Sequence, residues 1–156
     1  MTVSAATLMK QSPGSVSDDA LRRFLGYRLK RAHNVLHAGL VRALEPFGLR
    51  VVSYSALLMI VENPGLRQSQ LADALSIERP NMVLSIDELE KRKLIERHRD
   101  PEDRRAYALR PTPAGERLIA KATAAVEAHE REATRRLTPE DREAAFRILQ
   151  LLTETD

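Results

Sequence analysis

The sequence predicts a mainly α-helical chain that carries one charged β-hairpin, and two observations lead to this fold class. Apolar residues recur every three or four positions over long stretches near both ends, a spacing typical of amphipathic helices. Between these stretches, residues 94–109 change to two short runs separated by a turn cluster, which is typical of a hairpin. With 156 residues, the chain is expected to form a single domain.

Composition excludes several classes of protein. The chain has no cysteine, which excludes disulfide frameworks, thiolate zinc sites and cysteine nucleophiles. No apolar run approaches the roughly 18 residues of a membrane span, and residues 1–16 resemble a loose polar arm rather than a signal peptide. By elimination, we expect a cytoplasmic protein that does not bind membranes.

The first long helix is expected over residues 17–44, with Ser17 as its N-cap and its end near Pro46 and Gly48. Pro113 and Pro139 each follow a threonine and are suited to the first turn of a helix. Further helices are expected at 53–62, 68–75, 79–92, 113–137 and 139–152. The last of these is expected to bury Ala145, Phe146, Leu149 and Leu152.

The two short helices at 68–75 and 79–92 are separated by about three residues, the plan of a helix-turn-helix. Met82, Ile86 and Leu89 are spaced to face inward, which leaves Arg79, Asn81, Leu84, Ser85 and Glu88 on or beside the outer face. The hairpin that follows occupies the place of a wing. The fold class is therefore a winged helix-turn-helix with one β-hairpin wing and long N- and C-terminal helices, which would enter the DNA major groove through its second helix.

The positive charge is concentrated in and next to this wing. Residues 91–110 contain eight basic and four acidic residues, a net charge of +4 against +3 for the whole chain. Of the 25 basic residues, 20 are arginine, whose planar guanidinium suits phosphate and guanine. This segment either forms a solvated charged face or contacts the phosphates of nucleic acid.

The sequence resembles the MarR family of winged helix-turn-helix transcriptional regulators over about residues 20–152. The resemblance is carried by the runs Gln68–Ala72, Asp87–Arg97, Asp100–Arg105 and Thr112–Gly115. It implies a homodimer that reads a pseudo-palindrome in double-stranded DNA, with dimerisation helices at 17–47 and 112–152 and the winged domain at 50–111. It also implies a repressor that a small aromatic or anionic ligand releases.

The residues expected to contact DNA lie on both helices of the motif and in the wing. They are Gln68, Ser69, Gln70, Arg79, Pro80, Asn81, Leu84, Ser85, Arg97, Arg99, Asp103, Arg104 and Arg105. Asn81 and Arg79 would read bases. By resemblance, Asp103 would orient Arg105 into the minor groove and Arg104 would meet the backbone.

Three residues depart from the family pattern. Lys93 stands where glycine usually closes the second helix, so either the helix ends differently or Lys93 has an unfavourable positive φ. Leu84 replaces a polar or basic residue and would contact a thymine methyl group or no base at all. Pro111 lacks an N–H and is expected to end the hairpin pairing early.

The resemblance implies a ligand site beside the helices expected at 17–44 and 53–62, where Tyr27 and Tyr54 are candidate walls or else core residues. The candidate effector-binding residues are Tyr27, Arg31, His33, His37, Tyr54 and Leu58. His33 and His37 have the i, i+4 spacing of metal ligands, but no third ligand is evident and no metal or cofactor is expected. They are otherwise surface histidines.

No motif for catalysis is present, so we expect a regulator rather than an enzyme. The alternative is an architectural DNA-binding protein without an effector. An architectural protein would show little sequence preference, whereas a regulator would prefer its site by about 10³-fold or more.

Overall fold

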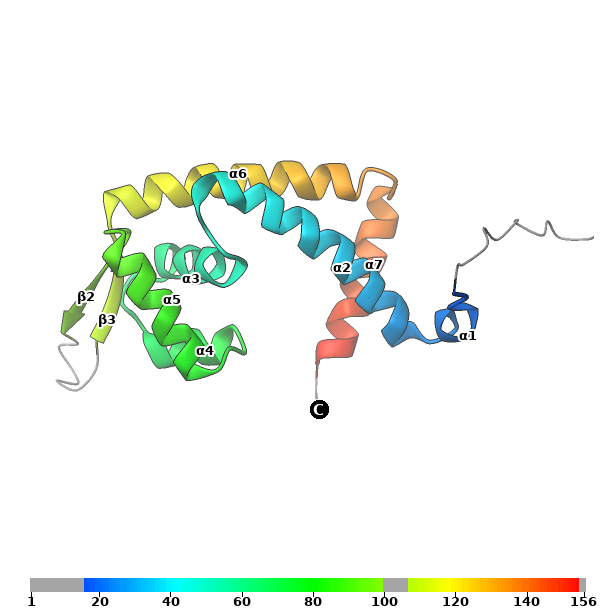
Figure 1. Cartoon of the computed structure of the whole chain (residues 1–156), viewed down its shortest axis with the longest axis horizontal. Coiled ribbons are helices and arrows are strands. Elements are labelled where there is room, and N and C mark those ends of the chain that lie inside the picture. The colour runs from blue at the N-terminus through cyan, green and yellow to red at the C-terminus, as the bar shows by residue number, and fades with distance from the viewer. Residues whose placement is uncertain (1–15, 100–106, 155–156) are drawn as a thin grey trace, which may run out of the picture. The chain divides into compact units, whose positions relative to one another are not determined.

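The computed structural model describes residues 16–99 and 107–154 (Figure 1). The chain divides into two compact units, Met1–Val35 and Leu36–Asp156, with the division inside helix α2 (Leu25–Leu44). The expected N-terminal arm lies outside the described residues except for Val16. Within the described ranges, no single helix is long and apolar enough to cross a membrane.

The first unit contains α1 (Asp19–Arg22) and the beginning of α2. The continuous helix expected over residues 17–44 is wrong, because the helix is interrupted at residues 23 and 24. At this break the carbonyl of Arg22 accepts a hydrogen bond from the side chain of Arg28. That carbonyl would otherwise accept from a backbone N–H of the next turn, so the side-chain contact stabilises the interruption.

Asp18, rather than Ser17, is the N-cap residue of α1. Its carboxylate accepts hydrogen bonds from Arg22 Nε at 2.6 Å, Tyr27 Oη at 2.6 Å and Arg31 Nη1 at 2.8 Å. The hydrogen bonds from Arg22 and Tyr27 lower the pKa of Asp18 to about 2. Two of the candidate effector-binding side chains, Tyr27 and Arg31, are therefore already engaged by a carboxylate of their own unit.

The second unit begins with the C-terminal part of α2, and α3 lies at its centre. The further elements are η1 (Glu45–Phe47), α3 (Val51–Glu62), β1 (Leu66–Arg67), α4 (Gln68–Ala74), α5 (Arg79–Lys91), β2 (Ile95–Arg99), β3 (Tyr107–Pro111), α6 (Pro113–Ala133) and α7 (Pro139–Thr153). Helix α3 contacts α5, α6 and β3, and its Leu57 and Ile60 are completely buried. The expected helices are confirmed, although α6 ends four residues earlier than predicted.

The three strands form an antiparallel sheet in the order β1–β3–β2. Strand β1 was not predicted, because two residues are too few to show an alternating pattern. The expected early end at Pro111 is also wrong, since Pro111 pairs in register with Ile95 of β2. The carbonyl of Leu109 accepts from Gly65 on the β1 side. Pro111 lies two residues further along β3, so its backbone nitrogen faces that same side, beyond the end of β1. The missing N–H of Pro111 therefore removes no hydrogen bond to β2.

The junction between the wing and α6 explains the Thr-Pro-Ala-Gly run. Thr112 Oγ1 accepts a hydrogen bond from Gly115 N at 3.1 Å and donates to the carbonyl of Lys93 at 2.8 Å. A Cβ on Gly115 would lie 2.1 Å from the carbonyl oxygen of Leu94. Threonine thus caps the helix and holds it to the wing, while glycine permits their close approach.

Helix α7 starts at Pro139, as the sequence predicts, and Thr138 and Asp141 form a capping box there. The expected burial along its apolar face is wrong. Phe146 is 70% exposed, Leu149 46% and Leu152 53%, and Ala145 is only partly buried. Within the described chain no residue of α7 is buried, so its apolar stripe remains uncovered in the monomer.

Candidate nucleic-acid interface and adjoining groove

Helix α5 is held so that its first turn is exposed. Met82, Ile86 and Leu89 have no exposed surface and anchor one face of the helix in the core. The turn before α5 is tight, because Ser76 has a φ of 51° and the N–H of Ile77 donates to Ala72 O. Helix α4 contacts α5, so the pair forms the helix-turn-helix that the sequence predicts.

The exposed residues at the start of α5 match the predicted reading surface in all but one case. Arg79, Pro80 and Asn81 are exposed, and Leu84 is 63% exposed. Ser85 corrects the prediction, since it is 3% exposed and its hydroxyl donates to Asn81 O at 3.2 Å. The hydroxyl of Ser85 therefore supports the helix instead of facing outward.

The N-terminus of α4 contributes a second exposed edge. Ser69 and Gln70 are exposed and Gln68 is half-buried. Gln70 Oε1 accepts a hydrogen bond from the backbone N–H of Arg67 at 2.9 Å. Gln70 thereby caps α4, which leaves Ser69 as the more available polar side chain of this edge.

Arg97 connects the wing to α5. It lies on β2, and its side chain pairs with Asp87 and, at 2.6 Å, with Glu90 Oε2. Because its side chain is only 24% exposed and both acids belong to α5, Arg97 fixes the wing against α5 in this structure. Arg99, at the end of the same strand, is exposed and pairs in register with Tyr107.

The remaining three candidate wing residues, Asp103, Arg104 and Arg105, lie outside the described residues. Their roles stay predictions. The base of the wing is defined, because β2 and β3 pair from Ile95 with Pro111 to Arg99 with Tyr107. The candidate residues therefore belong to the connection between two paired strands.

The end of α5 shows which of the two alternatives for Lys93 applies. Lys93 has a φ of 57°, the left-handed conformation in which glycine is favoured. Its N–H donates to Glu90 O and the N–H of Leu94 donates to Leu89 O, so the helix is closed normally by a lysine. The alternative, a helix that ends differently, is not observed.

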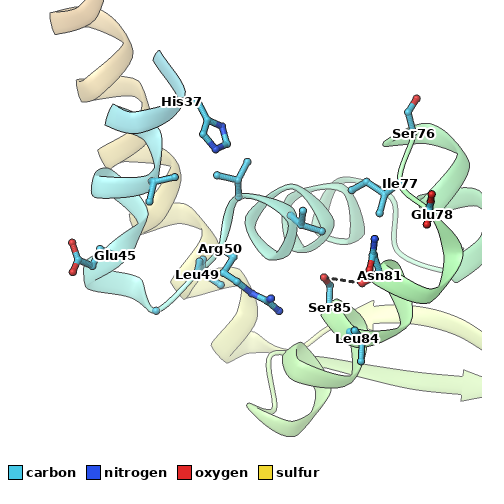
Figure 2. Close-up of a pocket in the computed structure, with 14 residues that line it drawn as sticks. His37, Glu45, Leu49, Arg50, Ser76, Ile77, Glu78, Asn81, Leu84 and Ser85 are labelled. Carbon is cyan, nitrogen blue, oxygen red and sulfur yellow. Dashed lines mark hydrogen bonds between the residues drawn. The ribbon is translucent and has the colours of Figure 1, made fainter. Parts of the chain in front are cut away.

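An open groove of about 1040 Å³ lies between α5 and the segment that joins α2 to α3 (Figure 2). Its wall on the α5 side includes Asn81 and Leu84, two of the candidate reading residues. Its opposite wall includes Arg50 and Val51, and Figure 2 shows the Arg50 side chain extending toward α5. The other lining residues are His37, Val41, Glu45, Gly48, Leu49, Val52, Ser76, Ile77, Glu78 and Ser85.

Of the candidate effector-binding residues in the second unit, only His37 lines this groove. Tyr54 is 8% exposed and shares a hydrogen bond of 3.2 Å with Thr123 Oγ1 of α6, so it belongs to the core. Leu58 is half-buried and packs against the core. Tyr27, Arg31 and His33 belong to the first unit. Among the described residues, no group of three metal-binding side chains occurs.

Three charged side chains connect the groove to α5 by contacts that were not predicted, and only Glu88 among them was named, as an outer-face residue. Arg50 pairs with Glu88, and Arg92 donates to the carbonyls of Phe47 and Gly48 at 2.9 and 2.6 Å. These contacts join residues about 40 positions apart, so no local pattern could reveal them. Arg92 belongs to the basic segment of residues 91–110, whereas Arg50 is the only basic residue between Arg42 and Arg67, so its surroundings in the sequence give no signal.

The exposed start of α5, the α4–α5 turn and the adjoining hairpin define a winged helix-turn-helix protein. Comparison with known proteins identifies its family. The pattern of the MarR family matches residues 47–106. A protein of Thauera aromatica, described as a transcriptional regulatory protein for the hcr operon, is 32% identical over 85% of this chain and 80% of its own length. The chain therefore belongs to the MarR family of transcriptional regulators.

Solved structures of one repressor show the same architecture. The repressor CouR bound to a 23-mer DNA duplex is 34% identical, with a TM-score of 0.84 over 90% of this chain and 99% of that one. CouR from Rhodococcus jostii RHA1 bound to p-coumaroyl-CoA is 31% identical, with a TM-score of 0.78 over 88% and 99%. The predicted fold class and family are confirmed.

Proposed function

We propose that this chain is a homodimeric, sequence-specific repressor of transcription that a small ligand releases from double-stranded DNA. The observation that carries the DNA-binding part is the exposed first turn of α5, where Arg79 and Asn81 stand on a helix whose opposite face is fully buried. Arginine and asparagine are the side chains that read guanine and adenine in the major groove. The likeness to CouR, whose structure contains a DNA duplex, supports this reading.

The homodimer is supported by apolar surface that the monomer leaves uncovered. On α7, Phe146 and Leu151 are 70% and 66% exposed. Phe146, Leu149 and Leu152 are three positions apart in turn and therefore lie on one face of α7, and an exposed apolar face is typical of a protein interface. We place the dimer contacts in residues 17–47 and 112–152 and the DNA contacts in residues 50–111, so that a two-fold axis would place two recognition helices on a pseudo-palindrome.

The ligand response is assigned to the groove beside α5. Asn81 and Leu84 line the groove and also belong to the proposed reading surface. A ligand in the groove would therefore contact the same helix that reads the operator. An aromatic or acyl carboxylate, a phenol or a thioester is the proposed class, consistent with p-coumaroyl-CoA in CouR.

The experiment measures binding of the full chain to a duplex from upstream of its own gene and to a shuffled duplex of equal length. We expect a preference of about 10³-fold or more, and a slope of log K against log salt of about −5 to −9 for roughly 6–10 phosphate contacts. Light scattering at the same concentrations should give a dimer. Equal affinity for both duplexes would favour the architectural alternative, and a monomer bound to DNA would contradict the homodimer.

A further inference from the structure

Two arginine contacts hold one wall of the groove against the recognition helix α5. Arg92 donates to the backbone carbonyls of Phe47 and Gly48, and Arg50 pairs through Nη2 with Glu88 Oε2. Glu88 and Arg92 are four residues apart and therefore lie on the same face of α5. The segment from residue 47 to residue 50 is thus connected to the C-terminal half of the helix at two adjacent points.

The two contacts differ in how easily another molecule can replace a partner. The acceptors of Arg92 are backbone carbonyls, which are fixed by the chain. The partner of Arg50 is a flexible carboxylate, and the side chains of Arg50 and Glu88 are 68% and 34% exposed. Exposed ion pairs contribute little net stability, so a competing anion can replace Glu88 at small cost.

The charges around the groove direct an anion to Arg50. Among the described residues that line the groove, Arg50 is the only arginine or lysine, whereas Glu45 and Glu78 would repel an anion elsewhere. A guanidinium binds a carboxylate or phosphate with paired, charge-assisted hydrogen bonds. In Figure 2 the Arg50 side chain lies between the two walls, within reach of a molecule held there.

We propose that Arg50 is the anion receptor of the groove and that Glu88 is its resident counter-ion, which a carboxylate or phosphate of a bound ligand replaces. This inference rests on the proposed function and names the residue through which the groove would act on DNA binding. When Glu88 leaves Arg50, the C-terminal half of α5 keeps only the Arg92 contact to residues 47–48. The recognition helix then loses part of its support, and DNA affinity falls.

The first part of the test needs no ligand. Glu88→Gln should lower DNA affinity by about 1.5- to 5-fold, because this factor corresponds to the free energy that an exposed ion pair contributes. Simple electrostatics predicts the opposite sign, because the substitution removes a negative charge near DNA. The exchange Arg50→Glu with Glu88→Arg keeps both charges and should restore affinity. Glu154→Gln, at an exposed position after the end of α7, serves as the control for the loss of one carboxylate. Tighter DNA binding by Glu88→Gln, with an unchanged melting temperature, would overturn the proposal.

The second part uses p-coumaroyl-CoA and salicylate as probes, because the first carries phosphates and the second only a carboxylate. Each probe that binds the wild type should bind Glu88→Gln more tightly, by about 1.5- to 5-fold, and should lose most of its effect on Arg50→Gln. If a probe releases wild type and Arg50→Gln from DNA equally, the receptor role is wrong although the proposed function stands. If neither probe binds the wild type, the anion receptor is overturned, while duplex binding in the same titration still tests the proposed function separately.

Discussion

At the scale of single residues, the ion pairs of Arg97 bear on its predicted contact with DNA. The sequence predicts a phosphate contact, but the structure pairs Arg97 with Asp87 and Glu90 of α5. A salt titration separates the two roles, because only a phosphate contact changes the number of released counterions. We expect Arg97→Ala to weaken DNA binding by about 5-fold, which corresponds to the loss of about 1 kcal/mol of ion pairing. The slope of log K against log salt should stay at its wild-type value. Arg99→Ala, on the exposed end of β2, should instead make the slope less steep by about one per wing; equal slopes for both variants would contradict this assignment.

Lys93 carries a second prediction at this scale. Its φ of 57° is unfavourable for a residue with a Cβ and favourable for glycine. Lys93→Gly should therefore raise the free energy of unfolding by about 0.5–1 kcal/mol. Lys91→Gly removes the same charge from the last helical position of α5 and should lower it by up to about 1 kcal/mol. Chemical denaturation measures both, and destabilisation by Lys93→Gly would show that the left-handed conformation carries no strain here.

At the scale of elements, the contact between the wing and α6 depends on one missing methyl group. A Cβ at Gly115 would lie 2.1 Å from Leu94 O, which is backbone and cannot move independently. Gly115→Ala should lower the free energy of unfolding by about 1–3 kcal/mol through overpacking, although alanine is the better helix former by about 1 kcal/mol. Gly26→Ala is the matched control, since its Cβ would meet nothing within 4 Å. Thermal unfolding of both variants checks this, and equal stability of the two would contradict the tight junction.

At the scale of the whole molecule, the uncovered stripe of α7 predicts that assembly and DNA binding are linked. Phe146→Asp places a charge on a side chain that is 70% exposed in the chain and buried in the proposed dimer. Burying an unpaired charge is strongly unfavourable, so we expect monomers by light scattering and loss of operator binding. Leu84→Asp places the same charge on an exposed apolar residue of α5. This variant should remain dimeric while binding DNA weakly. Dimers of Phe146→Asp at micromolar concentration would place the interface elsewhere.

The sequence by itself determined which segments form helices and where most of them begin. Helices end at prolines, glycines and caps because those residues act on neighbouring backbone groups, as Thr112 and Thr138 do here. The same local logic placed the α4–α5 turn, whereas for Lys93 the comparison with the family pattern left two alternatives, of which the structure shows the positive φ. The exposure of Arg79 and Asn81, which are predicted to read bases, follows from helical periodicity once the buried face is known.

Tertiary structure decided which partners the side chains and strands find. Periodicity could not separate Leu84, which is exposed, from Ser85, which is buried, because adjacent positions flank the boundary of the apolar face. The pairing of Arg50 with Glu88 spans 38 residues, and the tolerance of Pro111 depends on a two-residue strand more than 40 positions away. Such contacts arise from the packing of distant segments, whereas capping and periodicity act within a few residues of the chain.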